Sequence, residues 1–193
     1  MTVISVVIGS TREGRFSEKP ARWILQHLKQ RDGIDARLLD LRDFPMPFFD
    51  QPLPPAMPGR AAFDNPVVQK WTAAIAQSDG FVFVTPEYNY GPTAVLKNAI
   101  DWVYPEWQRK AVGFVSYGAA MGVRSVQQLR EIAIELQLAP IRLSVHIPVA
   151  TLWAHFQGGD VDAGLAELTA PADAMIGDLL WWTAALKKAR DSV

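Results

Sequence analysis

Cysteine is absent from this sequence of 193 residues. The absence excludes disulfide bonds, thiolate catalysis, zinc sites built on thiolates and cysteine-ligated iron–sulfur clusters. Because a chain without disulfides suits a reducing compartment, we expect this protein to act in the cytoplasm.

An excess of charge of either sign is also lacking. The chain carries 19 basic and 20 acidic side chains, for a formal net charge of -1. No overall field therefore attracts it to nucleic acid or to an anionic membrane. We expect its partner to be a small molecule.

Long apolar runs are missing as well. No run approaches the ~20 residues that span a bilayer, and residues 1–8 do not combine a basic stretch with a long apolar one. We therefore expect a protein that is neither exported nor inserted in a membrane. With 49% hydrophobic and 20% charged residues, the length suits a single α/β domain over residues 1–193.

Short apolar runs alternate with amphipathic patterns along the chain. The runs predict strands at residues 3–8, 34–41, 81–84, 111–115 and 141–147. Apolar residues at helical spacing predict helices between them and after the last one. These helices begin at Ser17 and near residue 67, and lie over residues 93–102, 126–136 and 165–186.

The order of the strands follows from their composition. The first, third and fourth runs are almost wholly apolar, as in strands covered on both faces, whereas the second and fifth include polar residues, as at sheet edges. This pattern favours a five-stranded parallel sheet of order 2-1-3-4-5 in a flavodoxin-like three-layer α/β/α fold. Such an order places the loops after strands one, three and four side by side.

The loop after the first strand, residues 9–17, nearly matches the phosphate loop of nucleoside triphosphatases. The match fails because Arg15 stands in the lysine position and Phe16 in that of the magnesium-binding hydroxyl. Donors that suit a terminal phosphate monoester remain, together with the N–H groups of a helix start. They are the hydroxyls of Ser10, Thr11 and Ser17 and the guanidinium groups of Arg12 and Arg15. The alternative is a surface turn in which Ser17 only caps the helix.

The loop after the third strand, residues 85–91, ends an apolar run with the sequence Thr-Pro-Glu-Tyr-Asn-Tyr-Gly. Pro86 fixes its own φ, and Gly91 followed by Pro92 supplies a hinge and then a residue suited to the first turn of a helix. Two tyrosines, a carboxylate and a carboxamide at the carboxyl end of a parallel strand suit a flat aromatic ligand.

Residues 42–66 hold seven prolines and cannot form a regular element. A loop of this length is a functional flap, a partner surface or a disordered linker. Five apolar side chains that need cover argue against the linker: Phe44, Met46, Phe48, Phe49 and Phe63.

Four motifs follow one another on or beside these loops. They are Gly-Ser-x-Arg-x-x-x-x-Ser at residues 9–17, Pro-Glu-Tyr-Asn at 86–89, Leu-Lys-Asn-Ala-Ile-Asp-Trp at 96–102 and Ser-x-Gly-x-x-x-Gly-x-Arg at 116–124. From residue 3 to about residue 136 the chain resembles the NADPH-dependent FMN reductase family of flavodoxin-like proteins, which includes quinone, chromate and azo-dye reductases. One departure is Met121, because family members often carry a second glycine before the one that matches Gly122.

The resemblance implies that the first loop binds the FMN phosphate and that the loops at residues 86–89 and 116–122 flank the isoalloxazine. The residues expected around FMN are Ser10, Arg12, Arg15, Phe16, Ser17, Pro86, Glu87, Tyr88, Asn89, Ser116, Tyr117, Gly118 and Gly122. N–H groups of residues 117–122, just before a helix, are candidates to stabilise negative charge near flavin N1.

Other polar and aromatic residues are interpreted as structural. Hydrogen bonds are expected to anchor the site from Lys97, Asn98 and Asp101. No metal site is expected, and the histidines are interpreted as incidental, because metal-ligand spacing is lacking among His27, His146 and His155. Packing on the domain is the simplest role for Trp181 and Trp182.

The function implied by the resemblance is an FMN-dependent oxidoreductase. It accepts a hydride from NADPH or NADH at flavin N5 and passes electrons to a quinone or similar acceptor; the cofactor does the chemistry, so no catalytic side chain is expected. Two alternatives stay open, a flavodoxin-type electron carrier without NAD(P)H activity and a flavin-free interaction protein on the same scaffold. Balanced charge argues against the carrier, which needs an acidic face for basic partners.

A homodimer or tetramer is also expected, with the flavin pocket completed across an interface. Three aromatic side chains crowd the end of the third predicted helix, and aromatics are enriched at interfaces. They are Trp102, Tyr104 and Trp107. The alternative is that they fold back onto their own domain.

Overall fold

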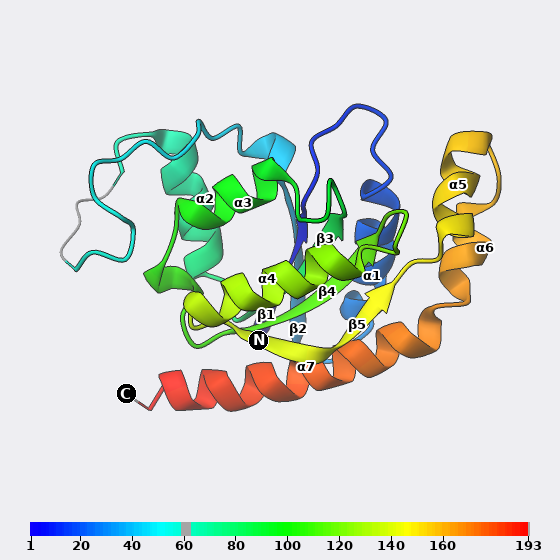
Figure 1. The fold of residues 1–193 in the computed structure, drawn as a ribbon. Helices are drawn as coiled ribbons and strands as arrows, with labels where there is room; N and C mark the ends of the chain where they lie inside the picture. The colour runs from blue at the N-terminus through cyan, green and yellow to red at the C-terminus, as the bar shows by residue number, and fades with distance from the viewer. Residues whose placement is uncertain (59–62, 193) are drawn as a thin grey trace.

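The computed structural model describes residues 1–58 and 63–192. Five parallel strands form one sheet of order β2-β1-β3-β4-β5, which confirms the flavodoxin-like order expected from the sequence (Figure 1). The strands are β1 (Thr2–Ile8), β2 (Ile34–Asp40), β3 (Gly80–Pro86), β4 (Ala111–Tyr117) and β5 (Ala139–His146).

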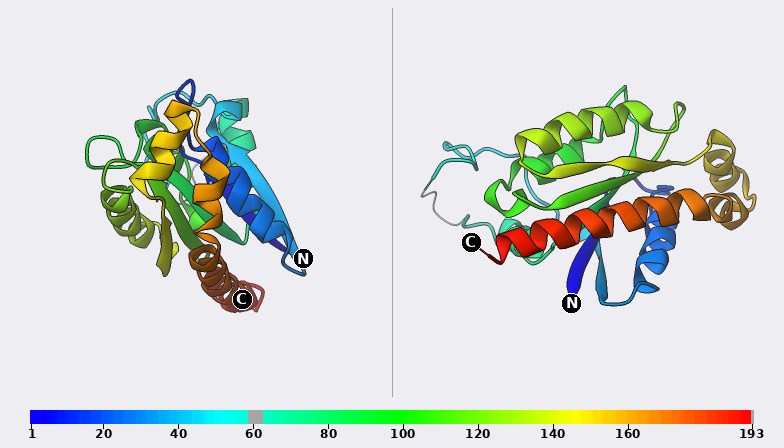
Figure 2. Two further views of the ribbon diagram at one scale, coloured as in Figure 1. Left: turned by 90° about the vertical axis from the view of Figure 1, so that its right-hand side faces the viewer. Right: turned by 90° about the horizontal axis from the view of Figure 1, so that it is seen from below.

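Helices cover both faces of the sheet and complete three layers (Figure 2). One face carries α1 (Glu18–Lys29) and α7 (Thr169–Arg190), and the other carries α2 (Pro66–Ala76), α3 (Ala94–Asp101) and α4 (Val123–Glu135). The other described helices are η1 (Leu41–Asp43), η2 (Pro105–Trp107), α5 (Val149–Gln157) and α6 (Val161–Ala166). Within the described ranges, no helix has both the length and the apolar character needed to cross a membrane.

Burial of each strand follows its place in the sheet. Every residue of β3 and β4 is buried, because each of these strands has a neighbour on both sides and helices over both faces. In β2 only Leu39 is buried, and in β5 only Ile141 and Val145 are. These two strands are the edges, as their mixed composition predicts.

Two apolar clusters, one on each face of the sheet, make up the core. On the α1 and α7 face, aliphatic side chains such as Val82 and Val115 pack against the helices. Aromatic rings dominate the other face, where the Trp107 ring lies 4.9 Å from Phe81 and 5.9 Å from Phe83, centroid to centroid.

The aromatic residues after α3 belong to this second cluster, so Trp102 and Trp107 are not the interface aromatics that the sequence suggested. Trp102 and Trp107 are 1% and 0% exposed. The rings of Phe49 and Phe63 cover Trp102 edge-on at 5.1 and 5.2 Å, and the Trp102 Nε1–H donates to the Pro47 carbonyl at 2.8 Å. These side chains fold back onto their own domain because the long loop supplies their cover.

The long loop is fastened to α3 by Asn98. The Asn98 side chain accepts from the Phe49 N–H at 2.9 Å and donates to the Pro47 carbonyl at 2.8 Å, which gives it an anchoring role of the kind expected. Residues 59–62 of this loop lie outside the described residues.

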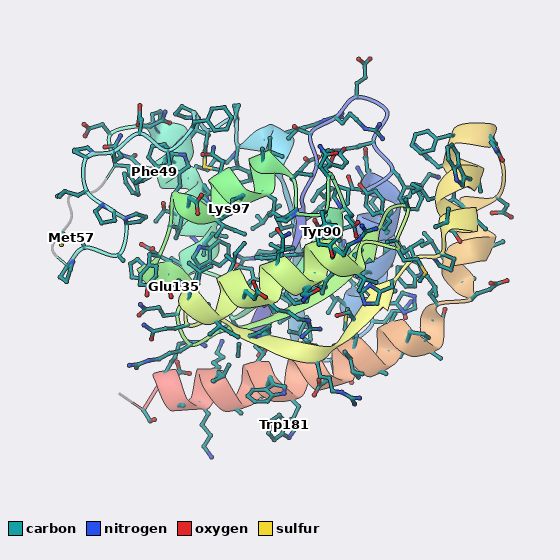
Figure 3. All side chains as sticks on the ribbon, in the orientation of Figure 1. Phe49, Met57, Tyr90, Lys97, Glu135 and Trp181 are labelled. Carbon is teal, nitrogen blue, oxygen red and sulfur yellow. The ribbon has the colours of Figure 1, made fainter. Side chains whose placement is uncertain are left out.

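The tryptophan pair on α7 faces outward. Trp181 and Trp182 are 66% and 40% exposed, so the expectation that they pack on the domain is wrong. Figure 3 shows the Trp181 side chain pointing away from the sheet. The buried stripe of α7 is formed by other residues, Ala172, Met175, Ile176, Leu179 and Thr183.

The C-terminal end of α7 is tied to the sheet by Asp79, which immediately precedes β3. The Asp79 carboxylate accepts from Lys187 Nζ at 2.6 Å, from Arg190 Nη2 at 2.9 Å and from the Val3 N–H at 2.9 Å. Burial alone would raise the pKa of Asp79, but these donors hold it below its usual value.

Replacing Asp79 with Asn should lower the free energy of unfolding near neutral pH by about 1–3 kcal/mol, because the charge-assisted hydrogen bonds to Lys187 and Arg190 are lost. A carboxylate with a depressed pKa stabilises the fold above its unfolded pKa, and this contribution is lost as the pH falls through the folded pKa. The gap between wild type and variant should therefore close as the pH falls below ~3.9. Urea unfolding across this range measures the gap.

The matched control is Asp173→Asn, which removes an exposed ion pair with Arg31 (Arg31 Nη2 to Asp173 Oδ1, 2.5 Å). An exposed pair contributes at most about 1 kcal/mol. Equal losses from the two variants would contradict the anchoring role of Asp79.

Candidate functional site

The loops that follow β1, β3 and β4 meet at the carboxyl edge of the sheet (Figure 1). The Gly9 N–H donates to the Val84 carbonyl at 2.9 Å, and the Glu87 N–H donates to the Tyr117 carbonyl at 3.0 Å. The Thr93 hydroxyl adds a bond to the Gly9 carbonyl at 2.5 Å. The three loops therefore form one connected frame, as the strand order predicts.

Arg15 in the first loop is buried against Asp40 at the end of β2. Its Nη1 donates to Asp40 Oδ1 at 2.7 Å and to the Ser10 carbonyl at 2.6 Å, and its Nη2 donates to the other Asp40 oxygen. Burial would raise the pKa of Asp40, but Arg15 holds it below its usual value. Arg15 thus shapes the loop from within, and direct phosphate binding by Arg15 stays a prediction.

A second arginine, Arg42, holds the same loop from outside. Its Nη2 donates to the Arg12 carbonyl at 2.6 Å and its Nε to the Thr11 carbonyl at 3.2 Å. Neither Arg42 nor Asp40 carries a motif signal, and both lie more than twenty residues along the chain from the loop they hold. Sequence reasoning missed them because only the fold brings them together.

Phe16 and Ser17 lie beneath the loop, and both are 0% exposed. The Phe16 ring packs edge-on against Tyr117 at 4.9 Å, so it faces the core. Ser17 stands at the N-cap position of α1, but its φ of -53° and ψ of -24° are helical and its side chain makes no capping bond. The expected Ser17 cap is therefore wrong, since a capping residue needs extended backbone to turn its oxygen toward the helix.

The Ser17 hydroxyl is consequently unsatisfied. Within the described residues it is fully buried and has no hydrogen-bond partner at a good distance and angle, although the Tyr117 side chain lies near it. Such a group costs about 1–3 kcal/mol, and this one lies at a helix N-terminus, where an anion is favoured. Arg12 lies exposed on the same loop. These donors fit a phosphate group, which would give the hydroxyl a partner.

The Pro-Glu-Tyr-Asn segment leads into a tight hairpin. The N–H groups of Tyr88 and Gly91 each donate to the other's carbonyl, at 2.9 and 3.0 Å. Asn89 and Tyr90 between them have φ of 48° and 78°, the pair of positive values that a type I′ turn requires. Tyr88 and Tyr90 are exposed on this turn, and the Tyr88 hydroxyl lies 3.4 Å from Ser10 Oγ.

Glu87, in contrast, turns inward and joins the hairpin to α4. Its Oε1 lies 2.8 Å from Arg124 Nε, and its Oε2 accepts from the Arg124 N–H at 3.2 Å. The Arg124 guanidinium also lies 4.6 Å from the Tyr90 ring centroid. Glu87 and Arg124 therefore fix the position of the tyrosines. The arginine that ends the fourth motif was the sequence signal for this contact, although Arg124 was not among the expected site residues.

The loop after β4 is held by Ser116 and His146. Ser116 Oγ donates to the Met121 carbonyl at 2.8 Å and lies 2.8 Å from His146 Nδ1. Because the hydroxyl has a single proton, His146 must donate from Nδ1. Burial lowers the pKa of His146, which keeps the ring neutral near neutral pH.

Two histidines thus touch the loops of the site, which corrects their interpretation as incidental. His146 supports the loop after β4, and His155 Nε2 lies 3.1 Å from the Gly14 carbonyl in the first loop. His27 lies elsewhere, on α1, with its Nδ1 3.4 Å from Asp173. The structure's described residues contain no group of three or more His, Asp or Glu that could hold a metal ion.

Gly122 is required by space as well as by backbone conformation. Its φ is 77°, and a Cβ there would lie 2.6 Å from the Ser116 Cβ and 2.7 Å from the Tyr117 nitrogen. Met121, the departure from the family pattern, has a φ of 55°. The backbone therefore adopts a glycine-like conformation at Met121 and places an exposed thioether side chain at the site.

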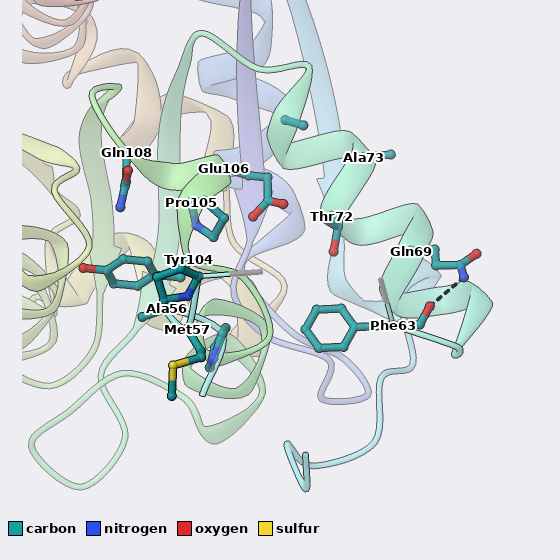
Figure 4. A pocket seen from close by; sticks show the side chains of 13 residues that line it. Ala56, Met57, Phe63, Gln69, Thr72, Ala73, Tyr104, Pro105, Glu106 and Gln108 are labelled. Atoms are coloured by element: carbon teal, nitrogen blue, oxygen red, sulfur yellow. Dashed lines mark hydrogen bonds between the residues drawn. The ribbon is translucent and has the colours of Figure 1, made fainter. Parts of the chain in front are cut away.

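A separate pocket of about 670 Å³ lies between α2, η2 and the long loop (Figure 4). Phe63 and Tyr104 line it, and Gln69 Nε2 closes one side by donating to the Phe63 carbonyl at 2.6 Å. None of the residues that line it belongs to the loops after β1, β3 and β4.

The sheet order and the converging loops define a flavodoxin-like protein. The model of the family described as NADPH-dependent FMN reductase matches residues 1–151. The chain is 35% identical over 157 residues to an NAD(P)H-dependent FMN reductase from Nectria sp, a match that covers 78% of each chain. It is 33% identical over 140 residues to an NAD(P)H:quinone oxidoreductase from Solanum tuberosum, covering 70% of this chain and 69% of that one.

A solved structure agrees in fold. FerB, a flavoenzyme NAD(P)H:(acceptor) oxidoreductase from Paracoccus denitrificans, matches with a TM-score of 0.66 over 93% of this chain and 97% of that one, at 22% identity. The chain belongs to the NADPH-dependent FMN reductase family. The family expected from the four motifs is confirmed, as are the oxidoreductase class and the FMN cofactor.

Replacing Gly122 with Ala should lower the free energy of unfolding. A strained backbone alone costs about 1–3 kcal/mol, and the loss should exceed this value because the new methyl group meets Ser116. Gly33→Ala is the matched control, since Gly33 has a φ of 74° and no atom lies within 4 Å of the place that its new methyl group would take. Urea unfolding compares the two, and equal losses would show that the contact with Ser116 imposes no constraint.

Proposed function

We propose that this chain passes a hydride from NADPH or NADH, through FMN, to a quinone or similar small acceptor. The observation that carries the proposal is the unsatisfied Ser17 hydroxyl at the start of α1, on the same loop as the exposed Arg12. Ser10 of this loop lies 3.4 Å from the Tyr88 hydroxyl of the aromatic hairpin, oxygen to oxygen. The acceptor class is supported by relatives, which include a quinone reductase from Escherichia coli that is 30% identical over 139 residues.

The phosphate of FMN would be held by Ser10, Arg12, Ser17 and the first turn of α1. Isoalloxazine would lie against Tyr88 and the loop at residues 117–122. The order of the loops along the carboxyl edge supports this arrangement. The hairpin after β3 lies between the first loop, after β1, and the loop after β4.

When bound, FMN supplies the hydride-transfer chemistry. The chain binds and orients it and offers backbone N–H groups near N1. Met121, Val123 and Arg124 already use their N–H groups for Gly118, Ala120 and Glu87. The N–H groups of residues 117–120 and 122 therefore remain the candidates. Because Glu87 is paired with Arg124, its negative charge is compensated and would not oppose the negative charge that develops near flavin N1.

A flavodoxin-type electron carrier is the weaker alternative. A carrier presents an acidic face to basic partners, whereas this chain has 19 basic and 20 acidic side chains. Oxidation of NADPH by the purified protein separates the two functions. A cytoplasmic location stays a prediction, which cell fractionation tests.

Replacing Arg12 with Ala should weaken FMN binding by about 1.5–3 kcal/mol, because a charge-assisted contact to the phosphate is lost. Riboflavin, which lacks the phosphate, should bind wild type much less well than FMN and should be insensitive to the substitution. Quenching of flavin fluorescence measures both affinities.

The control for Arg12→Ala is Arg22→Ala, which removes an equal charge from the exposed face of α1, where Arg22 pairs with Glu18 at 2.7 Å. It should leave FMN affinity nearly unchanged. Equal affinity of wild type for FMN and riboflavin would rule out the phosphate site.

Adding NADPH without oxygen to the FMN-loaded protein should bleach the flavin absorbance, and a quinone should restore it. Donor and acceptor use the flavin in turn, so steady-state plots should be parallel, as for ping-pong kinetics. Activity should survive alkylating agents and EDTA. A protein that holds FMN but is not reduced by NADPH would instead be an electron carrier.

We further propose that the working unit is a homodimer or tetramer whose interface completes the flavin pocket. With Trp102 and Trp107 buried, the support comes from exposed apolar side chains around the carboxyl edge. They are Phe48, Tyr88, Tyr90, Met121 and Val123. Apolar side chains gathered beside a ligand site favour cover by a second copy.

Sedimentation at micromolar concentration should show an assembly of at least two copies, and dilution should weaken FMN binding and activity together. A monomer that keeps full FMN affinity and reductase activity would contradict the shared pocket.

A further inference from the structure

We propose that α5 braces the first loop for FMN binding, with Phe156 and His155 as positioning residues that hold Arg12 and Gly14 where the phosphate is bound. The inference rests on the proposed FMN site and adds to it a part of the chain that the family match does not reach. That match ends at residue 151, so both residues lie beyond it.

Side chains of α5 contact every second residue of one part of the first loop, namely Arg12, Gly14 and Phe16. The Arg12 guanidinium carbon lies 5.7 Å from the Phe156 ring centroid, within the range of a cation–π interaction. His155 Nε2 lies 3.1 Å from the Gly14 carbonyl, and the His155 ring lies edge-on to Phe16 at 5.5 Å. Figure 1 shows α5 standing beside this loop and α1.

The partner of His155 at this contact decides which ring nitrogen carries a hydrogen. A carbonyl oxygen only accepts, so Nε2 must carry the hydrogen. The bond fixes the loop at Gly14, whose φ of 60° is a conformation that glycine adopts without strain. His155 therefore fixes the backbone of the loop, and Phe156 fixes one of its side chains.

Arg12 is the guanidinium of this loop that remains available to a ligand. Arg15 is committed to Asp40 and to the Ser10 carbonyl. Within the described residues, the Arg12 side chain forms no hydrogen bond or ion pair, and it lies against the Phe156 ring. An aromatic ring engages the face of a guanidinium and leaves the N–H groups at its edge free for a phosphate.

Bracing raises affinity because an arginine side chain loses rotamer freedom when it is fixed on a ligand. A ring that restricts Arg12 before FMN arrives removes part of that loss from the binding step. The opposite reading is that Phe156 draws Arg12 away from the phosphate, and the two readings predict changes of opposite sign.

The test measures dissociation constants for FMN and for riboflavin by fluorescence quenching. Phe156→Leu keeps the apolar volume but removes the ring face, and should weaken FMN binding roughly two- to fivefold. Phe156→Tyr keeps the ring and should bind FMN like wild type. Riboflavin affinity should be the same in all three proteins, since the brace acts only through the phosphate.

His155 is tested in the same way. His155→Ala should weaken FMN binding about two- to tenfold through loss of the bond to Gly14, and His155→Gln, whose amide can donate from a similar position, should recover most of it. Trp181→Ala is the matched control and should leave FMN affinity unchanged: it removes an exposed aromatic side chain from α7, where the Trp181 ring packs against Trp182.

A double variant closes the argument. Once Arg12 is replaced by Ala, Phe156→Leu should weaken FMN binding no further, because the ring has lost the group it holds. Thermal unfolding of each variant separates a folding defect from a binding defect.

Several outcomes would overturn the inference. Tighter FMN binding by Phe156→Leu would show that the ring sequesters Arg12. Equal losses for FMN and riboflavin, or an unchanged FMN affinity in both the leucine and alanine variants, would show that α5 does not act through the phosphate. If wild type itself binds FMN and riboflavin equally, the proposed phosphate site fails, and that result is distinct from failure of the brace alone.

Discussion

The buried ion pair between Arg15 and Asp40 is the constraint on which the first loop depends. A guanidinium removed from water needs a partner of opposite charge and acceptors for its remaining donors, and Asp40 and the Ser10 carbonyl supply them. By committing Arg15, the pair joins the loop after β1 to the end of β2 and leaves Arg12 as the exposed guanidinium of the loop. Arg42 and His155 hold the same loop at the Arg12 and Gly14 carbonyls.

Much of the fold could be predicted from composition alone, because the burial of a strand depends on its neighbours. Continuous apolar runs identified β3 and β4 as central, and mixed runs identified β2 and β5 as edges. The same reasoning failed for Trp102, since its cover comes from Phe49 and Phe63, far away in the sequence. Periodicity shows which side chains share a face, but it does not show which remote segment covers that face.

The site shows the same limit at closer range. The four motifs located the loops correctly, but residue type did not disclose which side chains turn inward. Glu87 looked like a ligand-facing carboxylate and is instead paired with Arg124. His146 looked incidental because its partner, Ser116, lies on a different strand. Such pairs become visible only when the register of β4 and β5 sets Ser116 opposite His146.

The attachment of α7 through Asp79 has a consequence for the order in which the molecule assembles. During synthesis every strand is complete before α7 is made, so the part of the α1 and α7 face of the sheet that α1 does not cover stays exposed until then. Exposed apolar sheet surface is prone to aggregate. The Asp79 carboxylate beside β3 therefore holds α7 in place only late in synthesis. Once Lys187 and Arg190 bind it, α7 covers the exposed apolar surface.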